Sequence, residues 1–302
     1  MRLVFQIILL VSLLFFGISL QSVKASDTSE KVNLGAGVWS LYVSESGVVF
    51  AGTLSNGLFR SEDNGQSFSE TSLTGVTVYQ ITEAPSGLLF AAAQNGIYRS
   101  NDGGRTWRRV NDGIEKPIGQ FVYAGESVQF AAIMQTGIYR STDNGLNWTP
   151  VNNGIELPYG YTVTSHGDRI IAGATNRMYV SENNGDSWRR IEAGFGSSRS
   201  TDILVHGDVL FVGTQEGVFI SEDAGDSWVE ISHGLDNKIV YGLAQTENGV
   251  YAATRGGLYH LPTSGTQWNL VSDSDVIIYA IAADQQGNLY LGNNAGVWYW
   301  QP

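Results

Sequence analysis

The chain of 302 residues carries 17 Lys and Arg side chains against 29 Asp and Glu, which gives a formal net charge of −12 at pH 7. This acidity argues against a nucleic-acid partner, because binding a phosphate backbone requires a basic surface. The sequence contains no cysteine, so a large packed core rather than disulfides must stabilise the fold.

Residues 1–25 predict a secretory signal peptide. Arg2 supplies the positive end, an apolar run extends from Leu3 to Phe16, and Val23-Lys24-Ala25 has the small residues of a cleavage site. The alternative is an uncleaved anchor, but the apolar run is shorter than the roughly 20 residues that a spanning helix needs. We therefore expect a periplasmic or secreted mature chain, residues 26–302, with no stable membrane insertion after cleavage.

One eight-residue motif recurs at a period of about 40 residues. Its pattern is Ser-x-Asp-x-Gly-x-(Ser/Thr/Asn)-(Trp/Phe), and a decayed sixth copy around Ser264–Trp268 keeps the Gly and Trp but lacks the acid. The five good copies begin at Ser61, Ser100, Ser141, Ser181 and Ser221. Between copies, short alternating stretches separated by turn residues leave room for about four strands per period.

Four short strands in each period predict the blades of a β-propeller, with a stacked β-solenoid as the alternative. The last repeat, Ile278–Trp300, stops before its motif and its fourth strand, whereas residues near 30–34 resemble the segments that follow the other motifs. We therefore predict an all-β fold comprising one domain, residues 26–302. It is a seven-bladed propeller of four-stranded blades, closed by an N-terminal strand that completes the last blade.

The motif resembles the Asp-box (BNR) repeat, and the resemblance covers essentially all of residues 26–302. In families with this repeat, the motif lies in the hairpin between the third and outer strands, away from the ligand funnel. Its Ser and Asp side chains bond to turn backbone, its Gly adopts an unusual φ and its Trp packs inward. The resemblance thus implies structural roles for Asp63, Asp102, Asp143, Asn183 and Asp223.

Catalytic chemistry finds little support in the sequence. The repeat also occurs in sialidases, which hold their substrate with three arginines from different blades. Arginines at positions tied to the repeat are poor candidates for such a triad, and only four arginines of the mature chain lie elsewhere: Arg169, Arg177, Arg199 and Arg255. The four histidines lack metal-ligand spacing: His166, His206, His233 and His260. We expect no catalytic residue, metal or cofactor. The alternative, a catalytic site assembled from distant loops, is not excluded by the sequence.

Propellers bind ligands at the mouths of the central channel. Aligning the innermost strands places aromatic residues in five of seven blades, with Thr201 in the fifth and either Gly119 or Gln120 in the third. This aromatic column comprises Trp39, Tyr79, Tyr161, Tyr241 and Tyr279. Packing between blades is the alternative to ligand binding for these rings. A second, polar column is predicted in the loops between second and third strands: Arg177, Glu216, Arg255 and Asn293.

In form, the chain looks like the photosystem II assembly-and-stability factors, which are exported seven-bladed Asp-box propellers that bind a membrane-protein partner. Sortilin-type receptors share the repeat with more blades. The resemblance implies a non-catalytic protein-interaction or assembly module with a protein partner and no cofactor. The alternatives are a carbohydrate-active enzyme, either a glycoside hydrolase or a polysaccharide lyase, and a lectin that binds glycans on the aromatic column.

Overall fold

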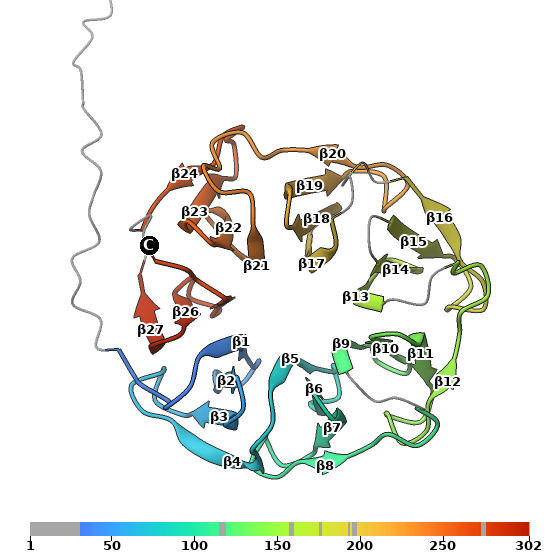
Figure 1. Cartoon of the computed structure of the whole chain (residues 1–302), viewed down its shortest axis with the longest axis horizontal. Helices are drawn as coiled ribbons and strands as arrows, with labels where there is room; N and C mark the ends of the chain where they lie inside the picture. The colour runs from blue at the N-terminus through green and yellow to red at the C-terminus, as the bar shows by residue number, and fades with distance from the viewer. Residues whose placement is uncertain are drawn as a thin grey trace, which may run out of the picture.

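Seven antiparallel sheets are arranged as blades around a central axis, and in each blade the chain runs from the innermost strand outward (Figure 1). Each innermost strand contacts that of the next blade, and β25 contacts β1. The predicted all-β, seven-bladed propeller is therefore confirmed.

The computed structural model describes residues 31–114, 119–156, 160–174, 177–192, 194, 198–272 and 276–301, without the side chains of 119–121, 124, 160 and 161. The predicted signal peptide, residues 1–25, lies outside the described residues. Within them, no helix is both long enough and apolar enough to cross a membrane.

The strands fall into four positions across the blades. The innermost strands are β1 (Val38–Val43), β5 (Val78–Glu83), β9 (Gly119–Ala124), β13 (Gly160–His166), β17 (Ser200–His206), β21 (Val240–Thr246) and β25 (Ala280–Ala283). The second strands are β2 (Val49–Thr53), β6 (Leu89–Ala93), β10 (Gln129–Ile133), β14 (Arg169–Ala174), β18 (Val209–Thr214), β22 (Gly249–Thr254) and β26 (Leu289–Asn293).

The third strands are β3 (Gly57–Ser61), β7 (Gly96–Ser100), β11 (Gly137–Ser141), β15 (Arg177–Ser181), β19 (Gly217–Ser221), β23 (Gly257–Pro262) and β27 (Gly296–Trp300). The outer strands are β4 (Ser69–Thr74), β8 (Arg108–Arg109), β12 (Thr149–Pro150), β16 (Arg189–Ile191), β20 (Val229–Glu230) and β24 (Asn269–Leu270). Most outer strands are only two residues long.

The N-terminal segment closes the ring. Val32 forms an antiparallel bridge with Val297 of β27, in which the Val32 amide donates to the Val297 carbonyl (2.9 Å) and the reverse bond measures 3.0 Å. In the fifth blade, Ile231 donates to Val218 in the same way. The predicted closure is therefore present, although its described part is one bridge rather than a full strand.

The hydrophobic core lies between neighbouring blades. The second strands β2, β6 and β10 are buried along their whole length. Small residues permit this close approach near the axis. An ideal Cβ added to Gly52 would lie 2.9 Å from Cβ of Val78 in the next blade, closer than side-chain carbons pack.

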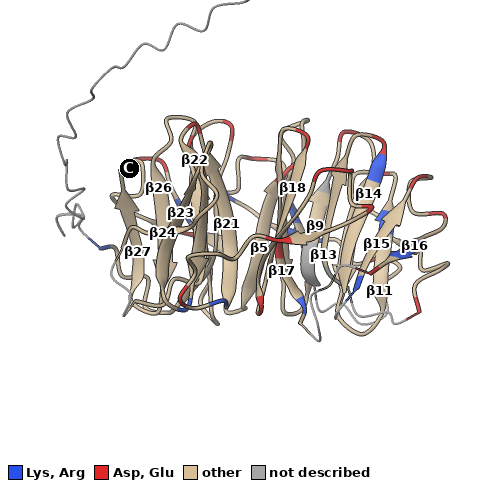
Figure 2. Ribbon diagram, turned by 90° about the horizontal axis from the view of Figure 1, so that it is seen from above, with Lys and Arg blue, Asp and Glu red and all other residues tan. Residues whose placement is uncertain are grey.

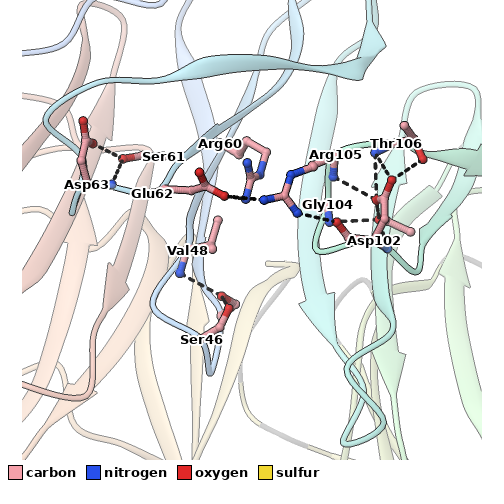
Figure 3. Close-up of polar contacts among 12 residues, drawn as sticks. Ser46, Val48, Arg60, Ser61, Glu62, Asp63, Asp102, Gly104, Arg105 and Thr106 are labelled. Atoms are coloured by element: carbon pink, nitrogen blue, oxygen red, sulfur yellow. Dashed lines mark hydrogen bonds and ion pairs between the residues drawn. The ribbon is translucent and has the colours of Figure 1, made fainter.

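Each described copy of the motif forms a hydrogen-bonded turn between the third and outer strands. In the copy at Ser141, Asp143 Oδ1 accepts from the Ser141 hydroxyl (2.8 Å) and the Asn147 amide (2.9 Å), while Gly145 N donates to Ser141 Oγ (2.9 Å). Figure 3 shows the bond from the Ser61 hydroxyl to Asp63 and the bonds from the Thr106 amide and hydroxyl to Asp102. These carboxylates thus bond within their own turns.

Arginines link the motif turns of adjacent blades. Glu62 accepts from Arg60 (2.8 Å) in its own blade and from Arg105 (2.7 Å) in the next blade (Figure 3). Arg99 likewise reaches the Asn144 carbonyl of the following turn at 2.9 Å. Solvent screens the pair between Glu62 and Arg105, because both side chains are exposed, whereas the Arg60 side chain is largely buried.

One motif turn carries a strained residue. Ala224 has φ 55°, at the position where other copies place Asn64 (57°), Asn144 (58°) and Gly103 (70°). Alanine is disfavoured in this left-handed conformation by about 1 kcal/mol, whereas asparagine tolerates it. We expect Ala224→Asn to raise the free energy of unfolding by about 0.5–1 kcal/mol, measured by urea denaturation.

The reciprocal substitution supplies the control. Asn144→Ala introduces alanine at the equivalent position of another copy, so it should lower stability by a similar amount. Equal stability of both variants and the parent protein would contradict the interpretation.

Candidate functional site

A cavity of about 410 Å³ lies on the axis of the ring and is lined by the innermost strands of all seven blades. Tyr79, Tyr241, Tyr279 and Trp39 all contribute to its wall. This cavity is the candidate site.

A β-bulge places the residues of the aromatic column at equivalent positions. In β1, Val38 pairs with Thr53 and Ser40 with Gly52, so the residue between them, Trp39, has no partner on β2. The same shift leaves Tyr79, Tyr161, Thr201 and Tyr241 unpaired in β5, β13, β17 and β21. In β9 the bulged residue is Gln120, which settles the ambiguity with Gly119. Bulges commonly re-aim a side chain at functional sites.

Three rings of the column form a continuous surface over adjacent blades. Trp39 stacks on Tyr279 with ring centroids 5.8 Å apart, and Tyr279 meets Tyr241 edge-on at 5.3 Å. We call these three residues the aromatic arc. The rings pack between blades, as the alternative interpretation expected, yet they also line the cavity, and Trp39 is 41% exposed. Packing therefore pre-organises the arc without covering it. The side chain of Tyr161 lies outside the described residues.

The aromatic arc lies at the end of the channel where the blade-to-blade linkers enter the innermost strands. The loops between second and third strands lie beside this end, because Leu54 N donates to Gly37 O (2.8 Å) and Arg255 N to Ile239 O (3.0 Å). We call this end the linker mouth. Leu54, whose amide makes the bond to Gly37, is an apolar residue that is 42% exposed.

The predicted polar column is wrong in register. The pairs Ala174↔Arg177, Thr214↔Gly217, Thr254↔Gly257 and Asn293↔Gly296 are equivalent, so Arg177, Glu216, Arg255 and Asn293 occupy four different positions. Hairpin pairing, which the sequence pattern left undefined, sets this register.

Asn294, the true counterpart of Arg255, donates to the Tyr279 hydroxyl at 3.4 Å. Arg255 acts on the corresponding ring, Tyr241. Burial raises the pKa of Tyr241 and the Arg255 guanidinium opposes the rise. These two loop residues therefore border the aromatic arc.

Arg177 and Glu216 do not line the cavity. Arg177 Nη1 pairs with Glu156 Oε2 at 2.8 Å, and the same oxygen accepts from Arg190 of the outer strand β16 at 3.2 Å. This ion pair holds the Arg177 guanidinium near the outer strand of the blade. Glu216 is solvent-exposed in its loop.

Sequence analysis missed Asp202, the one acidic residue among the described residues of the cavity wall. Its Oδ1 accepts from the Ile203 amide (2.9 Å), and its Oδ2 accepts from the Leu243 amide of the next blade (2.8 Å). Gln80 makes the equivalent interblade bond to Val122 N at 2.8 Å. The sequence did contain a signal for this residue, because Asp202 is an acid at a position of the innermost strand that is uncharged in the other blades.

Asp202 should make stability depend on pH. Burial raises its folded-state pKa from 3.8 to about 6. Between these values the folded protein holds a proton that the unfolded chain releases, so the free energy of unfolding falls as pH rises from about 4 to about 6. Asp202→Asn loses one of the two amide hydrogen bonds at every pH, because its NH2 group is a donor. We nevertheless expect its stability relative to the parent to rise by about 1–2 kcal/mol from about pH 4 to about pH 7, because only the parent carries a titrating carboxyl group. Urea denaturation across this pH range measures the difference.

Asp63 is a control of opposite sign. Hydrogen bonds from Ser61 and Ser67 lower its pKa to about 2, so its contribution is present above about pH 4 and is lost as pH falls through about 2. Asp63→Asn should therefore weaken the protein at neutral pH. A difference between Asp202→Asn and the parent that did not vary with pH would contradict the assignment.

Among the described residues, no group of three His, Asp or Glu side chains converges as a metal site would require. His206 bonds instead to Gln245 Oε1 at 2.6 Å, and His260 stacks on Tyr251 with centroids 4.3 Å apart. Both histidines have packing or hydrogen-bonding roles in the fold.

No protein-family model and no curated protein matches the chain. Among solved structures, the chain is similar to the extracellular domain of the hybrid two-component system BT4673 from B. thetaiotaomicron, with a TM-score of 0.72 and 17% identity over 91% of this chain and 39% of that one. YCF48 bound to D1 peptide gives a TM-score of 0.68 and 17% identity over 93% and 100% of the two chains. An inactive histidine variant of virginiamycin B lyase from Staphylococcus aureus with quinupristin gives 0.76 and 15% over 90% and 97%.

These similarities establish the seven-bladed propeller fold. The chain spans less than half of the bacterial extracellular domain that it matches, but nearly the whole of YCF48 and of the lyase.

Proposed function

We propose that this chain is an exported, non-catalytic Asp-box propeller that binds a protein partner at its linker mouth. The observation that carries the proposal is the aromatic arc, which forms exposed apolar surface beside a cavity. Exposed aromatic side chains that border a pocket are the residues that most often dominate protein–protein binding energy. Leu54 adds apolar surface to the same rim.

The chemistry of the cavity wall favours binding over glycoside hydrolysis. Hydrolysis of glycosides uses two carboxyl groups that face each other across the substrate. The described cavity wall contributes one, Asp202. The carboxylates of the motif are bonded within their own turns, which supports structural roles for Asp63, Asp102, Asp143 and Asp223, and Asn183 is bonded in the same way.

Two of the structural neighbours are consistent with this proposal, whereas the third is a lyase. YCF48 is bound to a peptide in its structure, and that protein matches the chain over its full length. The neighbour from B. thetaiotaomicron is an extracellular domain. Together with the signal-peptide pattern of residues 1–25, these features favour a periplasmic or secreted protein.

Site-specific photo-crosslinking tests the proposal. A photoreactive amino acid at position 39 should crosslink one partner protein in the native envelope, because Trp39 borders the mouth. The matched control is position 270, since Leu270 is also 41% exposed but lies on the outer strand β24. Equal crosslinking from both positions, or none from position 39, would count against the linker mouth as the binding surface. A purified protein that binds glycans through Trp39 would instead support a lectin.

Export makes a separate prediction. Mass spectrometry of the protein recovered from its native compartment should give a mature N-terminus at Ser26, because Val23-Lys24-Ala25 is the expected cleavage site. Recovery of the chain with its original N-terminus intact would argue for an anchored protein.

A further inference from the structure

We propose that the linker mouth receives an arginine side chain of the protein partner, whose guanidinium binds between Asp202 and the aromatic arc. This inference rests on the proposed function and names the chemistry that the mouth recognises.

The groups follow one another around the axis in the order needed for such a site. Asp202 lies on β17, Tyr241 on β21, Tyr279 directly before β25, and Trp39 on β1. The bond from Leu243 N brings the Asp202 carboxylate across to β21. There it faces Gly242, whose ideal Cβ position lies 3.8 Å from Asp202 Oδ2. Gly242 directly follows Tyr241 in β21, and Asp202 and the three rings of the arc all line the same cavity.

The Asp202 carboxylate has capacity for a cation. Each oxygen accepts one backbone amide, so about half of its four lone-pair positions stay available. It forms no ion pair with any described residue. Burying a carboxylate without a cation is unfavourable, and a ligand cation that pairs with it offsets that cost.

The groups around Asp202 do not compete with a ligand cation for its carboxylate. On the β13 side, Thr162 and Ser200 hydrogen bond to each other at 2.9 Å, and on the β21 side the titratable group is the Tyr241 phenol. Two cations, Arg199 before β17 and Arg255 after β22, are solvent-exposed. Arg255 therefore opposes a bound cation only through a screened, like-charge interaction.

Arginine fits this arrangement better than lysine or an anion. A guanidinium is weakly hydrated, stacks on aromatic faces and binds a carboxylate through two parallel hydrogen bonds. The protein's net charge of −12 attracts cationic partners over longer distances. Figure 2 shows Asp and Glu on the loops of both faces of the disc.

Titration with a small probe tests the inference. N-acetylarginine amide is added to the full chain and its binding is followed by NMR, with the neutral isostere N-acetylcitrulline amide as control. We expect the arginine probe to bind at least tenfold more tightly than citrulline. Asp202→Asn should weaken arginine binding about tenfold and leave citrulline unchanged, because a charge-assisted contact is lost. Arg255→Ala should tighten arginine binding about twofold.

The pH dependence of the unmodified protein gives an independent readout should a variant fail to fold. Arginine affinity should fall as pH decreases from about 8 to about 5, because Asp202 becomes protonated, and citrulline affinity should stay constant. Equal binding of the two probes, no binding of arginine, or full arginine affinity in folded Asp202→Asn would overturn the inference. If crosslinking from position 39 succeeds while these tests fail, the proposed function stands without the arginine.

Discussion

Trp148→Ala is expected to lower the free energy of unfolding by about 3–5 kcal/mol. Trp148 is 2% exposed and packs at the junction of the second and third blades with Phe90, Val122 and Tyr139. Its indole N–H also donates to the Val110 carbonyl (2.9 Å), in the segment that joins these blades. Truncation therefore creates a large cavity and leaves a buried acceptor without its partner. Urea denaturation measures the loss.

Trp39→Ala is the matched control, because it deletes the same side chain from an exposed site. It should change stability by less than about 1 kcal/mol. A comparable loss for both variants would mean that the aromatic arc contributes as much to stability as the buried junction between the blades.

A milder substitution separates packing from hydrogen bonding. Trp148→Phe keeps most of the ring but removes the donor to Val110, so it should cost about 1–2 kcal/mol beyond the change in volume. Trp188 and Trp268 make the same bond across blades, to Val151 O (2.6 Å) and Ile231 O (2.7 Å). Trp107 instead donates to Gly104 O in its own turn (2.9 Å), so its hydrogen bond does not join blades.

The fold could be predicted from the sequence because the same pattern of short alternating strands and turns accompanies each copy of the motif. Its Ser, Asp and Gly residues specify a turn through bonds within a few residues, and such local rules can be read from spacing alone. Ring closure by Val32 was predictable for the same reason, since the last repeat lacked an element that the N-terminal segment could supply. The bonds from Trp148, Trp188 and Trp268 to the preceding blade were not predictable from the motif, because these contacts depend on how the blades pack.

The candidate site was only partly predictable. The aromatic column follows from aligning innermost strands, since a bulge recurs at one position in six of them. The register of the loops does not follow, because the sequence pattern does not show at which residue each second strand ends. Arg177, the first residue of its third strand, was therefore placed with Arg255, the first residue of its loop. Asp202 was missed because Gln80, Ser40 and Thr162 occupy the same strand position, so a polar residue there attracts no notice until the cavity is seen.

Gly296→Ala is the second substitution that we expect to lower stability strongly, because Gly296 lies where the N-terminal segment closes the ring. Gly296 begins β27 with φ +128°, and an ideal Cβ there would lie 2.0 Å from the Val32 carbonyl oxygen. Alanine must therefore displace the closing segment, which breaks both Val32–Val297 hydrogen bonds and moves Lys31 from its position 4.7 Å from the Trp298 ring centroid. We expect a loss of about 3 kcal/mol in the free energy of unfolding.

Gly87→Ala separates backbone strain from ring opening. Gly87 also has a positive φ, +79°, but nothing lies within 4 Å of its ideal Cβ position, so this variant should lose only about 1 kcal/mol. Trypsin adds a local readout, because cleavage after Lys31 requires the closing segment to detach. Gly296→Ala should accelerate this cleavage in the folded protein and Gly87→Ala should not. The bridge is the backbone pairing that the described segment makes with the last blade. Equal cleavage in both variants would therefore mean that contacts between β25 and β1 close the ring without this pairing.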